Sequence, residues 1–496
     1  MNRISSLLRF SSADSAYRIR CSRRPMAEAL ESRTFLSAWA TVDTWQMIPG
    51  STGQCLAAGM ASDKAGNVYA AGVAADSNGI PHGIIREETN GVWSTVADVA
   101  NAGFNAVTTD SAGDVFASGC KNPSTSGGQP PSFTSSSNWI VAERAAGKAS
   151  FSVVNDPVST ANNATAYGIA ADQTGNVFVV GTAEETQKQG PIKTFTHWIV
   201  RKETIAQLLV GQDAFKTVDD YALSSASNRA YGVTNIASGP AAGLYVVGRG
   251  NYDWIVRRST NGGSTWATID DVTASGSAWA AYGVAGDASG NIYVVGRGLG
   301  ESWLVRKSSN GGTSWSTVDS YGTSATSDAY AVGADAAGNV YVAGRAYDST
   351  YTPHAVIREL PARGSTWSTV DDVYNNRYNA FTVDSFGNAY AGGSSQSFLV
   401  RSLPAAPMNL AAAAVSSSQI NLSWTNAAGG NQSGFAIYRS IDDANFSLVN
   451  TVSSGVTSYN DSGLTAGTTY YYYVVTLLNL DGSSNPSNIS SAVTAA

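Results

Sequence analysis

Cysteine and histidine are the scarcest reactive residues in this 496-residue sequence, which contains only three of each. Cys21, Cys55 and Cys120 are an odd number and have neither C-x-x-C nor metal-like spacing, so neither a disulfide framework nor a cysteine zinc site is indicated. The sequence also lacks G-x-S-x-G, H-E-x-x-H and phosphate-loop motifs. We therefore expect no metal and no cofactor, and no motif identifies a catalytic residue.

Charged residues and long apolar runs are scarce as well. Only 14% of the residues are charged, and no stretch approaches the roughly 18 apolar residues that a membrane-spanning helix needs. The net charge is −7, and because residues 1–38 have seven arginines against three carboxylates, the remainder carries −11. An acidic body argues against nucleic acid and anionic membrane surfaces as partners. We expect no nucleic-acid partner and no membrane span.

Residues that favour strands and tight turns are abundant. The sequence has 50 glycines, 23 tyrosines and 12 tryptophans, together with much Ala, Ser, Thr and Val. This composition is typical of many short strands joined by tight turns. It predicts an all-β protein with almost no helix.

A ten-residue pattern recurs along most of the chain, and Asp287 to Gly296 is a clear copy of it. Seven copies share an aromatic position: Tyr69, Phe116, Phe178, Tyr245, Tyr293, Tyr341 and Tyr390. The last four lie about 48 residues apart, a period in the range of propeller blades. Because the signature Asp stands three residues before a Gly-Asn or Gly-Asp pair, we interpret it as a turn residue; calcium binding is the alternative.

Each repeat contains four strand candidates joined by hairpin-length connections. In the fifth copy they are 281–287, 291–296, 303–307 and 315–319. Four such strands make one antiparallel blade. The final repeat stops at its third strand, Phe398 to Arg401, whereas Trp39 to Asp43 supplies a fourth-strand pattern ahead of the first full repeat. We predict a seven-bladed β-propeller over residues 39–402, closed by this N-terminal strand.

The repeat region resembles the families of SBBP-like seven-bladed propeller repeats. Two turns between third and fourth strands, Ser259 to Trp266 and Ser308 to Trp315, resemble Asp boxes with Asn in place of the usual Asp. In families that carry Asp boxes, sialidases among them, these turns are folding elements on the face away from the active site. The resemblance therefore implies a propeller scaffold without assigning chemistry.

The repeat signature vanishes after a short linker, residues 403–406. Residues 407–496 resemble a fibronectin type III domain, with a strand that ends in Trp424, a second strand over 435–439, and a tyrosine-corner segment at Leu464 to Tyr470. This resemblance implies a β-sandwich that serves as a spacer or an interaction module.

The N-terminal segment, residues 1–38, is rich in Arg and Ser and lacks the apolar centre of a standard secretory signal. Its stretch Glu28 to Ala38 resembles the LEPR-XLL motif of planctomycete surface proteins, with Ser32 where that motif has Pro. The resemblance implies an extracellular or cell-surface location. The alternative is a disordered basic leader without a targeting role.

Candidate ligand-binding residues come from two positions of the repeat that we expect on one face. The three histidines stand just ahead of the third strand, and Asp residues end the fourth: His82, His197, His354, Asp98, Asp220, Asp271 and Asp372. Variable loops on a rigid scaffold commonly carry binding sites. Because other repeats have Asn, Asp or Ser at the histidine position, the alternative is a solvent-facing loop residue.

Arginine recurs at one third-strand position, as Arg86, Arg201, Arg257, Arg306, Arg358 and Arg401. Aspartate recurs near the end of the fourth strand, for example at Asp219 and Asp270. Repeated opposite charges in adjoining strands favour structural ion pairs over a catalytic cluster. The even spread of these arginines, and the absence of an Arg-Ile-Pro segment, also argue against a sialidase.

These observations together predict an exported, non-catalytic binding or adhesion protein. Its expected partner is an extracellular glycan or a surface protein. A propeller carbohydrate-active enzyme, either a glycoside hydrolase or a lyase, is the first alternative, and a structural envelope component is the second. Sequence alone does not separate these three.

Overall fold

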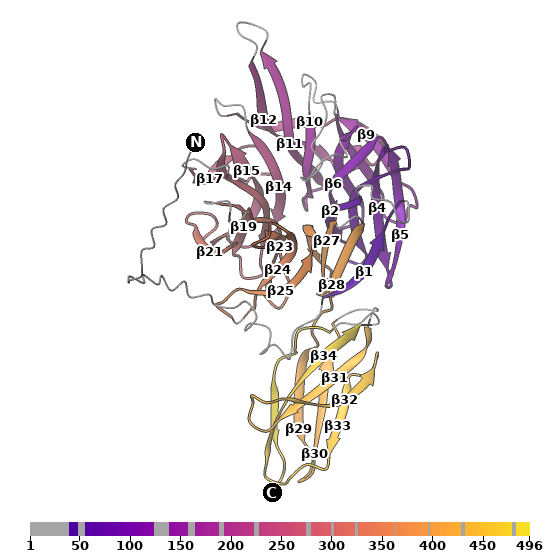
Figure 1. Cartoon of the computed structure of the whole chain (residues 1–496), viewed down its shortest axis with the longest axis vertical. Coiled ribbons are helices and arrows are strands. Elements are labelled where there is room, and N and C mark those ends of the chain that lie inside the picture. The colour runs from indigo at the N-terminus through magenta and orange to yellow at the C-terminus, as the bar shows by residue number, and fades with distance from the viewer. Residues whose placement is uncertain are drawn as a thin grey trace, which may run out of the picture. The chain divides into compact units, whose positions relative to one another are not determined.

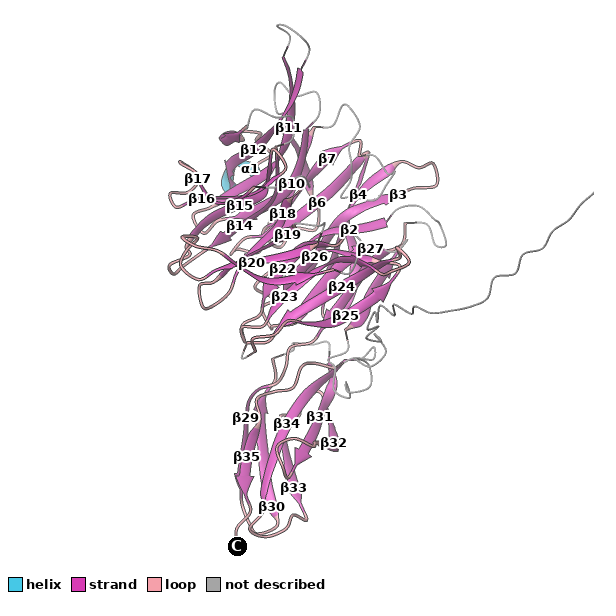
Figure 2. Ribbon diagram, turned by 60° about the vertical axis from the view of Figure 1, so that its left-hand side comes forward, coloured by secondary structure: helices cyan, strands magenta, loops and turns pink. Residues whose placement is uncertain are grey.

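The computed structural model describes residues 39–47, 55–123, 138–156, 164–187, 193–222, 228–273, 279–298, 302–322, 326–362, 364–394, 397–427, 432–478 and 483–496. The N-terminal segment, with its LEPR-XLL-like motif and Cys21, lies outside these residues. The described part of the chain is all-β, as expected, apart from one short helix, α1 (Ile205–Leu208) (Figure 2). That part contains no helix with the length and hydropathy to cross a membrane.

Seven four-stranded antiparallel sheets follow one another along the chain (Figure 1). Sheet 1 contains β2 (Cys55–Ser62), β3 (Val68–Ala75), β4 (Pro81–Thr89) and β5 (Val92–Ala100). Sheet 2 contains β6 (Ala102–Thr109), β7 (Val115–Lys121), β8 (Trp139–Arg144) and β9 (Ser152–Asp156). Sheet 3 contains β10 (Ala164–Ala171), β11 (Asn176–Gln187), β12 (Lys193–Thr204) and β13 (Lys216–Tyr221). Sheet 4 contains β14 (Arg229–Ile236), β15 (Gly243–Gly250), β16 (Asp253–Ser259) and β17 (Ala267–Val272). Sheet 5 contains β18 (Ala280–Gly286), β19 (Ile292–Arg297), β20 (Trp303–Ser308) and β21 (Ser316–Tyr321). Sheet 6 contains β22 (Asp328–Ala334), β23 (Val340–Tyr347), β24 (Pro353–Leu360) and β25 (Ser368–Tyr374).

The seventh sheet combines the two ends of the repeat region. It contains β26 (Arg377–Val383), β27 (Ala389–Ser394), β28 (Phe398–Leu403) and, as its fourth strand, β1 (Ala40–Trp45). β1 runs antiparallel to β28, with Thr41 opposite Arg401 and Asp43 opposite Val400. The pairing that we expected between these two segments is therefore present.

The first strands of the seven sheets contact one another in a closed cycle. The order of contacts is β2, β6, β10, β14, β18, β22, β26 and back to β2. These strands are rich in Ala and Gly, since seven strands that approach one common centre leave little room for side chains. Sheets 1 to 7 therefore surround a shared interior.

Large side chains pack between neighbouring sheets, and sheets 4 and 5 illustrate how. The fully buried Trp254 of β16 belongs to one hydrophobic cluster with Ala281 and Ile292 of sheet 5. A Cβ at Gly296 would lie 2.0 Å from the Ala280 carbonyl oxygen and 2.9 Å from Trp254 Cζ3. The repeated Gly at the end of the second strand is therefore needed for the preceding sheet's tryptophan to pack.

The signature Asp of the repeat closes the turn between first and second strands. Asp287 Oδ1 accepts hydrogen bonds from the backbone N–H groups of Ser289 and Asn291, each at 2.9 Å, and its Oδ2 accepts from Asn291 Nδ2 at 2.7 Å. Asp63, Asp172, Asp335 and Asp384 make the same bond to the N–H group four residues on. The interpretation of this Asp as a turn residue is confirmed.

The C-terminal segment forms a β-sandwich of two sheets. One contains β29 (Met408–Ala414), β30 (Gln419–Thr425) and β33 (Ser458–Ser462), and the other β31 (Gln432–Ser440), β32 (Ser447–Ser453), β34 (Thr469–Leu478) and β35 (Ser490–Val493). Trp424 meets Phe435 edge to face in its core, with ring centroids 5.5 Å apart. Tyr470 Oη accepts a hydrogen bond from the Thr465 N–H at 3.0 Å, which is the geometry of a tyrosine corner.

Candidate functional site

A central cavity of about 230 Å³ lies where the seven first strands meet, and every one of these strands contributes to its lining. Each first strand has a β-bulge at one lining residue, which directs that side chain toward the cavity. We call these seven residues the ring layer: Ala58, Asn105, Tyr167, Tyr231, Tyr282, Tyr330 and Asn379.

Four adjacent sheets supply tyrosines to the ring layer, and the rings contact one another in sequence. Tyr167 and Tyr231 have centroids 5.2 Å apart, Tyr231 and Tyr282 are also 5.2 Å apart, and Tyr282 and Tyr330 are 5.3 Å apart. Burial raises the pKa of Tyr167 to about 12 and raises the pKa of Tyr330 further. The phenols of Tyr167 and Tyr330 therefore stay protonated at neutral pH and can donate hydrogen bonds.

A second layer lies two residues before the ring layer, where the start of each first strand pairs with the end of the second strand. Directly opposed residues in antiparallel strands project to the same side of the sheet. The seven pairs, in sheet order, are Leu56 and Val73, Gly103 and Cys120, Thr165 and Thr182, Arg229 and Arg249, Ala280 and Arg297, Asp328 and Arg345, and Arg377 and Ser394. We call Arg229, Arg249, Arg297, Arg345 and Arg377 the arginine arc.

Asp328 is the one carboxylate of this second layer, and it is fully buried. Arg297 Nε donates to its Oδ1 at 2.6 Å and an Arg345 terminal nitrogen donates to its Oδ2 at 2.7 Å. Tyr330 Oη also donates to Oδ2, at 3.0 Å. Although burial disfavours the charge, the two guanidinium groups hold the pKa of Asp328 below its usual value. Asp328 is therefore a permanent anion at neutral pH.

Several buried polar atoms of the ring layer and of the arginine arc have no hydrogen-bond partner among the described residues. They are the Nε atoms of Arg229, Arg249 and Arg345, both amide atoms of Asn379, and Asn105 Oδ1. Burial is also the main reason why the pKa of Arg377 is lowered, and the neighbouring Arg345 lowers it further. Buried polar groups without partners are uncommon in folded proteins and are frequent at binding sites.

The histidines that we selected from the sequence do not line this cavity. Each lies within the third strand of its sheet and pairs through Nδ1 with an Asp on the fourth strand: His82 with Asp98 at 2.5 Å, His197 with Asp220 at 2.8 Å and His354 with Asp372 at 2.6 Å. The imidazoles are about 20% exposed. All three therefore lie in strands and not in loops, and each remains partly exposed to solvent beside its carboxylate partner.

These three His–Asp pairs belong to sheets 1, 3 and 6, so they do not form one constellation. Asp271, the fourth selected carboxylate, belongs to sheet 4, where burial together with Asp253 and Asp270 raises its pKa. All seven residues lie at the end of the sheets that carries the arginine arc, because the start of each third strand lies beside the end of the second strand. In sheet 4, for example, Gly250 at the end of β15 is opposite Asp253 at the start of β16. They lie on outer strands, whereas the arc and the ring layer lie on inner ones. The lining of the central cavity runs from the ring layer toward the opposite end of the first strands, so these seven residues and the arc lie outside it.

The recurring third-strand arginines make ion pairs between neighbouring sheets, which confirms the structural interpretation. The pairs, with their shortest distances, are Arg86 with Asp43 at 2.5 Å, Arg257 with Asp219 at 2.8 Å, Arg306 with Asp270 at 2.8 Å, Arg358 with Asp319 at 2.7 Å and Arg401 with Asp371 at 2.7 Å. We call these five the seam arginines. Arg201 is an exception: the preceding sheet has Asn155 at the Asp position, and Arg201 donates to the Phe215 carbonyl oxygen at 2.7 Å.

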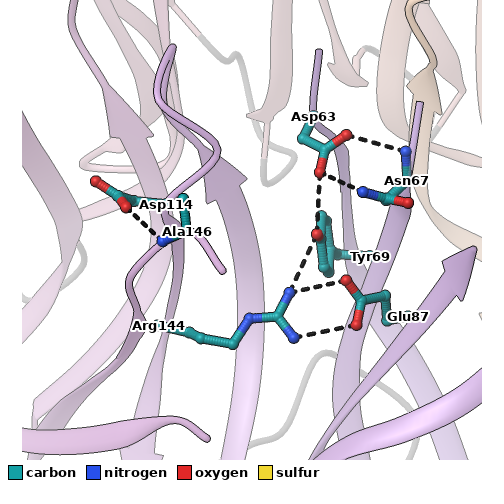
Figure 3. A network of polar contacts seen from close by, with 7 residues as sticks. All are labelled: Asp63, Asn67, Tyr69, Glu87, Asp114, Arg144 and Ala146. Atoms are coloured by element: carbon teal, nitrogen blue, oxygen red, sulfur yellow. Dashed lines mark hydrogen bonds and ion pairs between the residues drawn. The ribbon is translucent and has the colours of Figure 1, made fainter. Parts of the chain in front are cut away.

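We call the boundary between two neighbouring sheets a seam. The seam between sheets 1 and 2 has a different network of ion pairs and hydrogen bonds. Ala97 and Ala142 occupy the positions that hold Asp and Arg at the other seams. Arg144 instead reaches across to sheet 1, where it donates to both oxygens of Glu87, at 2.8 and 3.0 Å, and to Tyr69 Oη at 3.1 Å (Figure 3). Tyr69 in turn donates to Asp63 of the signature turn. The seam thus keeps an ion pair, two residues further along the third strand.

The arginine arc and the tyrosines of the ring layer were missed by our reading of the sequence. A signal for the arc was present, because Gly248, Gly296 and Gly344 are each followed by Arg. Among the described residues, no group of three His, Cys, Asp or Glu side chains could hold a metal ion. Cys55 and Cys120 are buried free thiols.

Comparison with known proteins identifies the C-terminal sandwich. Residues 405–493 match the fibronectin type III domain family. An Fn3-like protein from Clostridium thermocellum is 32% identical over 18% of this chain and 90% of that chain, with a TM-score of 0.16. The chain therefore contains a fibronectin type III domain at its C-terminal end, and the match begins two residues before the boundary that we expected.

Two further matches are also partial. A poly(3-hydroxybutyrate) depolymerase from Ralstonia pickettii is 43% identical over 89 residues, and the match spans 18% of this chain and only 16% of the depolymerase. Pectate lyase Pel3 from Pectobacterium carotovorum is 23% identical over 18% of this chain and 28% of that chain, with a TM-score of 0.17. The chain thus spans a small fraction of both enzymes.

Proposed function

We propose that residues 39–402 form a seven-bladed β-propeller that acts as a non-catalytic binding module, with the fibronectin type III domain as a spacer or interaction module. Seven successive four-stranded sheets, a closed cycle of contacts among the first strands, and the β1–β28 pairing support this architecture. The turns that resemble Asp boxes, in which Asn261 Oδ1 accepts from the Thr265 N–H, agree with it.

The single observation that carries the binding role is the arc end of the first strands, where the arginine arc lies next to the ring layer, and which we call the mouth. Aromatic side chains and buried, unpaired hydrogen-bonding groups converge there from several sheets. Concave sites with a few convergent polar groups are where small ligands bind most often. We propose that an extracellular glycan or a surface protein binds at this mouth.

The chemistry of the mouth favours binding over catalysis. Asp328 is held as an anion by Arg297 and Arg345, which makes it a weak general base. Its neighbour Tyr330 has a raised pKa, so its phenol is a poor nucleophile at neutral pH. The three His–Asp pairs lie in separate sheets and cannot act on one bond together.

We propose that the His–Asp pairs and Asp271 form an outer rim that contacts parts of the ligand beyond the cavity. They share the end of the sheets that carries the arginine arc, and the opposite end has short, similar turns. Neutralising Asp220, Asp271 and Asp372 together should weaken binding. Replacing Asn261 and Asn310 together, at the opposite end, should not. Loss of binding with the second set alone would reverse this assignment.

The proposed function is tested with the full chain on a glycan array and on a panel of polysaccharides. We expect specific retention of at least one glycan class and no release of shorter products. Turnover of a polysaccharide would instead favour a carbohydrate-active enzyme, and absence of both would favour a structural envelope component. Fractionation of the native host tests the proposed extracellular or cell-surface location, which the fibronectin type III domain supports.

A further inference from the structure

We infer that the arginine arc binds the acidic group of a sugar acid, and this inference rests on the proposed glycan-binding function. The ligand class is a glycan that bears an oxyanion, either a carboxylate or a sulfate ester. The arc recognises the oxyanion, and the tyrosines of the ring layer contact the body of the sugar.

The first step is the balance of charge in the second layer. Five arginines face one carboxylate, Asp328, which leaves a surplus of four positive charges within four consecutive sheets. Glu184 is a further charged neighbour of Arg229 and still leaves the arc clearly cationic. The rest of the chain after residue 38 is strongly acidic. A local cationic cluster on an otherwise acidic protein is a place where an anionic ligand is attracted, whereas the rest of the surface repels it.

The second step is the state of the arginines themselves. Arg229 lies beside Tyr231 and Glu184. The guanidinium group of Arg249 lies 5.5 Å from the ring of Tyr252. These two arginines are directly opposed across β14 and β15, so their side chains leave the sheet on the same side. Their Nε atoms are buried and have no hydrogen-bond partner in the described part of the chain. Like charges side by side are unfavourable unless an anion lies between them, and a planar guanidinium fork matches the geometry of a carboxylate or sulfate.

The third step is the one-sidedness of the mouth. Sheets 4 to 7 carry the arc, whereas sheets 1 and 2 present Leu56 with Val73 and Gly103 with Cys120 at the equivalent pairs. A ligand in this mouth therefore meets charge on one side and small uncharged groups on the other. Tyr167, Tyr231 and Tyr282 add aromatic faces and phenolic donors below. An acidic sugar has this same division between one charged group and a ring with apolar C–H faces.

The test compares an oligogalacturonate with its methyl ester, which has the same length and no charge, on the full chain. A sulfated galactose oligomer forms the third arm and distinguishes sulfate from carboxylate. The variant is the double substitution Arg229→Gln and Arg249→Gln. Its matched control is Lys202→Gln with Lys307→Gln, which removes the same charge from third strands at the opposite end of the sheets. Unfolding midpoints verify that both variants are folded.

We expect the native protein to bind at least one acidic oligomer ten or more times as tightly as the neutral ester, and to lose this preference as salt is added. The arc variant should lose most of that preference, and the lysine control should keep it. Equal binding of acid and ester, or an arc variant with native affinity, would overturn the inference and leave the proposed glycan binding intact. Failure of every glycan, neutral or acidic, would overturn both.

Discussion

Two sets of arginines occupy the same sheets and differ in what neutralises them. Each seam arginine, on a third strand, has an Asp from the preceding sheet within 2.5 to 2.8 Å. The arginine arc lies at the first and second strands, and Asp328 is its one carboxylate. Both sets are half-buried, so exposure does not explain the difference. What differs is whether an aspartate recurs in the sequence repeat together with the arginine.

The difference teaches how a repeat sequence separates scaffold from site. A pair that recurs at five of the seven seams has the same role in each of these sheets, so selection for folding accounts for it without any ligand. Charges that appear on four consecutive sheets and are absent from the others break the symmetry of the repeat. Because these charges do not follow the repeat, they are the part of the molecule in which a specific function is expected.

The largest effect that we expect comes from removing β1. Deletion of residues 1–44 takes away Asp43, which Arg86 contacts, and the Trp39 carbonyl and Thr41 hydroxyl that Arg401 contacts. It also leaves β28 as an open sheet edge. Loss of one partner from a buried ion pair alone costs about 3–5 kcal/mol, so the free energy of unfolding should fall by at least this amount in denaturant titrations.

Deletion of residues 1–38 is the matched control for this experiment, because it retains β1 with its ion pair. This shorter deletion should leave the unfolding midpoint unchanged. If the two deletions gave the same stability, the seam that β1 completes would contribute nothing, and the proposed closure of the ring would be wrong.

Asp328→Asn should have the next largest effect, and it should depend on pH. The pKa of Asp328 is lowered in the fold by Arg297 and Arg345 against the opposing effect of burial. Its charge therefore stabilises the protein above the usual pKa of about 3.9, and this contribution is lost as the pH falls through the lower folded value. We expect a loss of about 3 kcal/mol at pH 7, shrinking near pH 3.

The measurement is denaturant unfolding of the native protein and of this variant at both pH values. A penalty of the same size at pH 3 and pH 7 would show that the Asn side chain fails for steric reasons and that the charge of Asp328 is not responsible.

A smaller effect should separate the two sets of arginines directly. Arg306→Ala leaves Asp270 without its partner across the seam, and should lower the free energy of unfolding by about 1–3 kcal/mol. Arg249→Ala relieves its opposition to Arg229, and should change stability by less than about 0.5 kcal/mol. The two substitutions are compared by thermal and chemical unfolding. A reversed order would mean that the arc is structural and the seams are dispensable.

Much of the architecture could be predicted from the sequence because a repeat reports the same structure many times. The turn Asp, the small inner strands and the seam pairs recur with fixed spacing, and the orphan strand at each end indicated their pairing. The sandwich was recognisable from Trp424 and the segment that ends at Tyr470. Each of these features depends on local spacing, which sequence records directly.

The candidate site was less predictable because it depends on register and on bulges. Arg229 and Arg249 are neighbours only through the pairing of β14 with β15, and Tyr231 faces the cavity because a bulge falls at that residue. The histidines were visible as a set, yet their pairing with Asp98, Asp220 and Asp372 is a diagonal contact between strands that spacing does not show. None of the arc arginines stands at the two repeat positions from which we chose candidate residues, so the whole arc was missed.

The smallest effect should come from restoring the missing pair at the seam between sheets 1 and 2. Ala97→Asp alone, or Ala142→Arg alone, places an unpaired charge at a position that is at most 9% exposed, so each should be destabilising. The double variant recreates the arrangement of the other seams and should recover part of the loss, with a coupling energy of about 1 kcal/mol in a double-mutant cycle. Arg144 and Glu87 already neutralise each other there, so the restored pair adds to an existing network and its gain is modest. Strictly additive penalties would show that the geometry of this seam differs from the others, and that Arg144 replaced the pair because the sheets no longer approach in the same way.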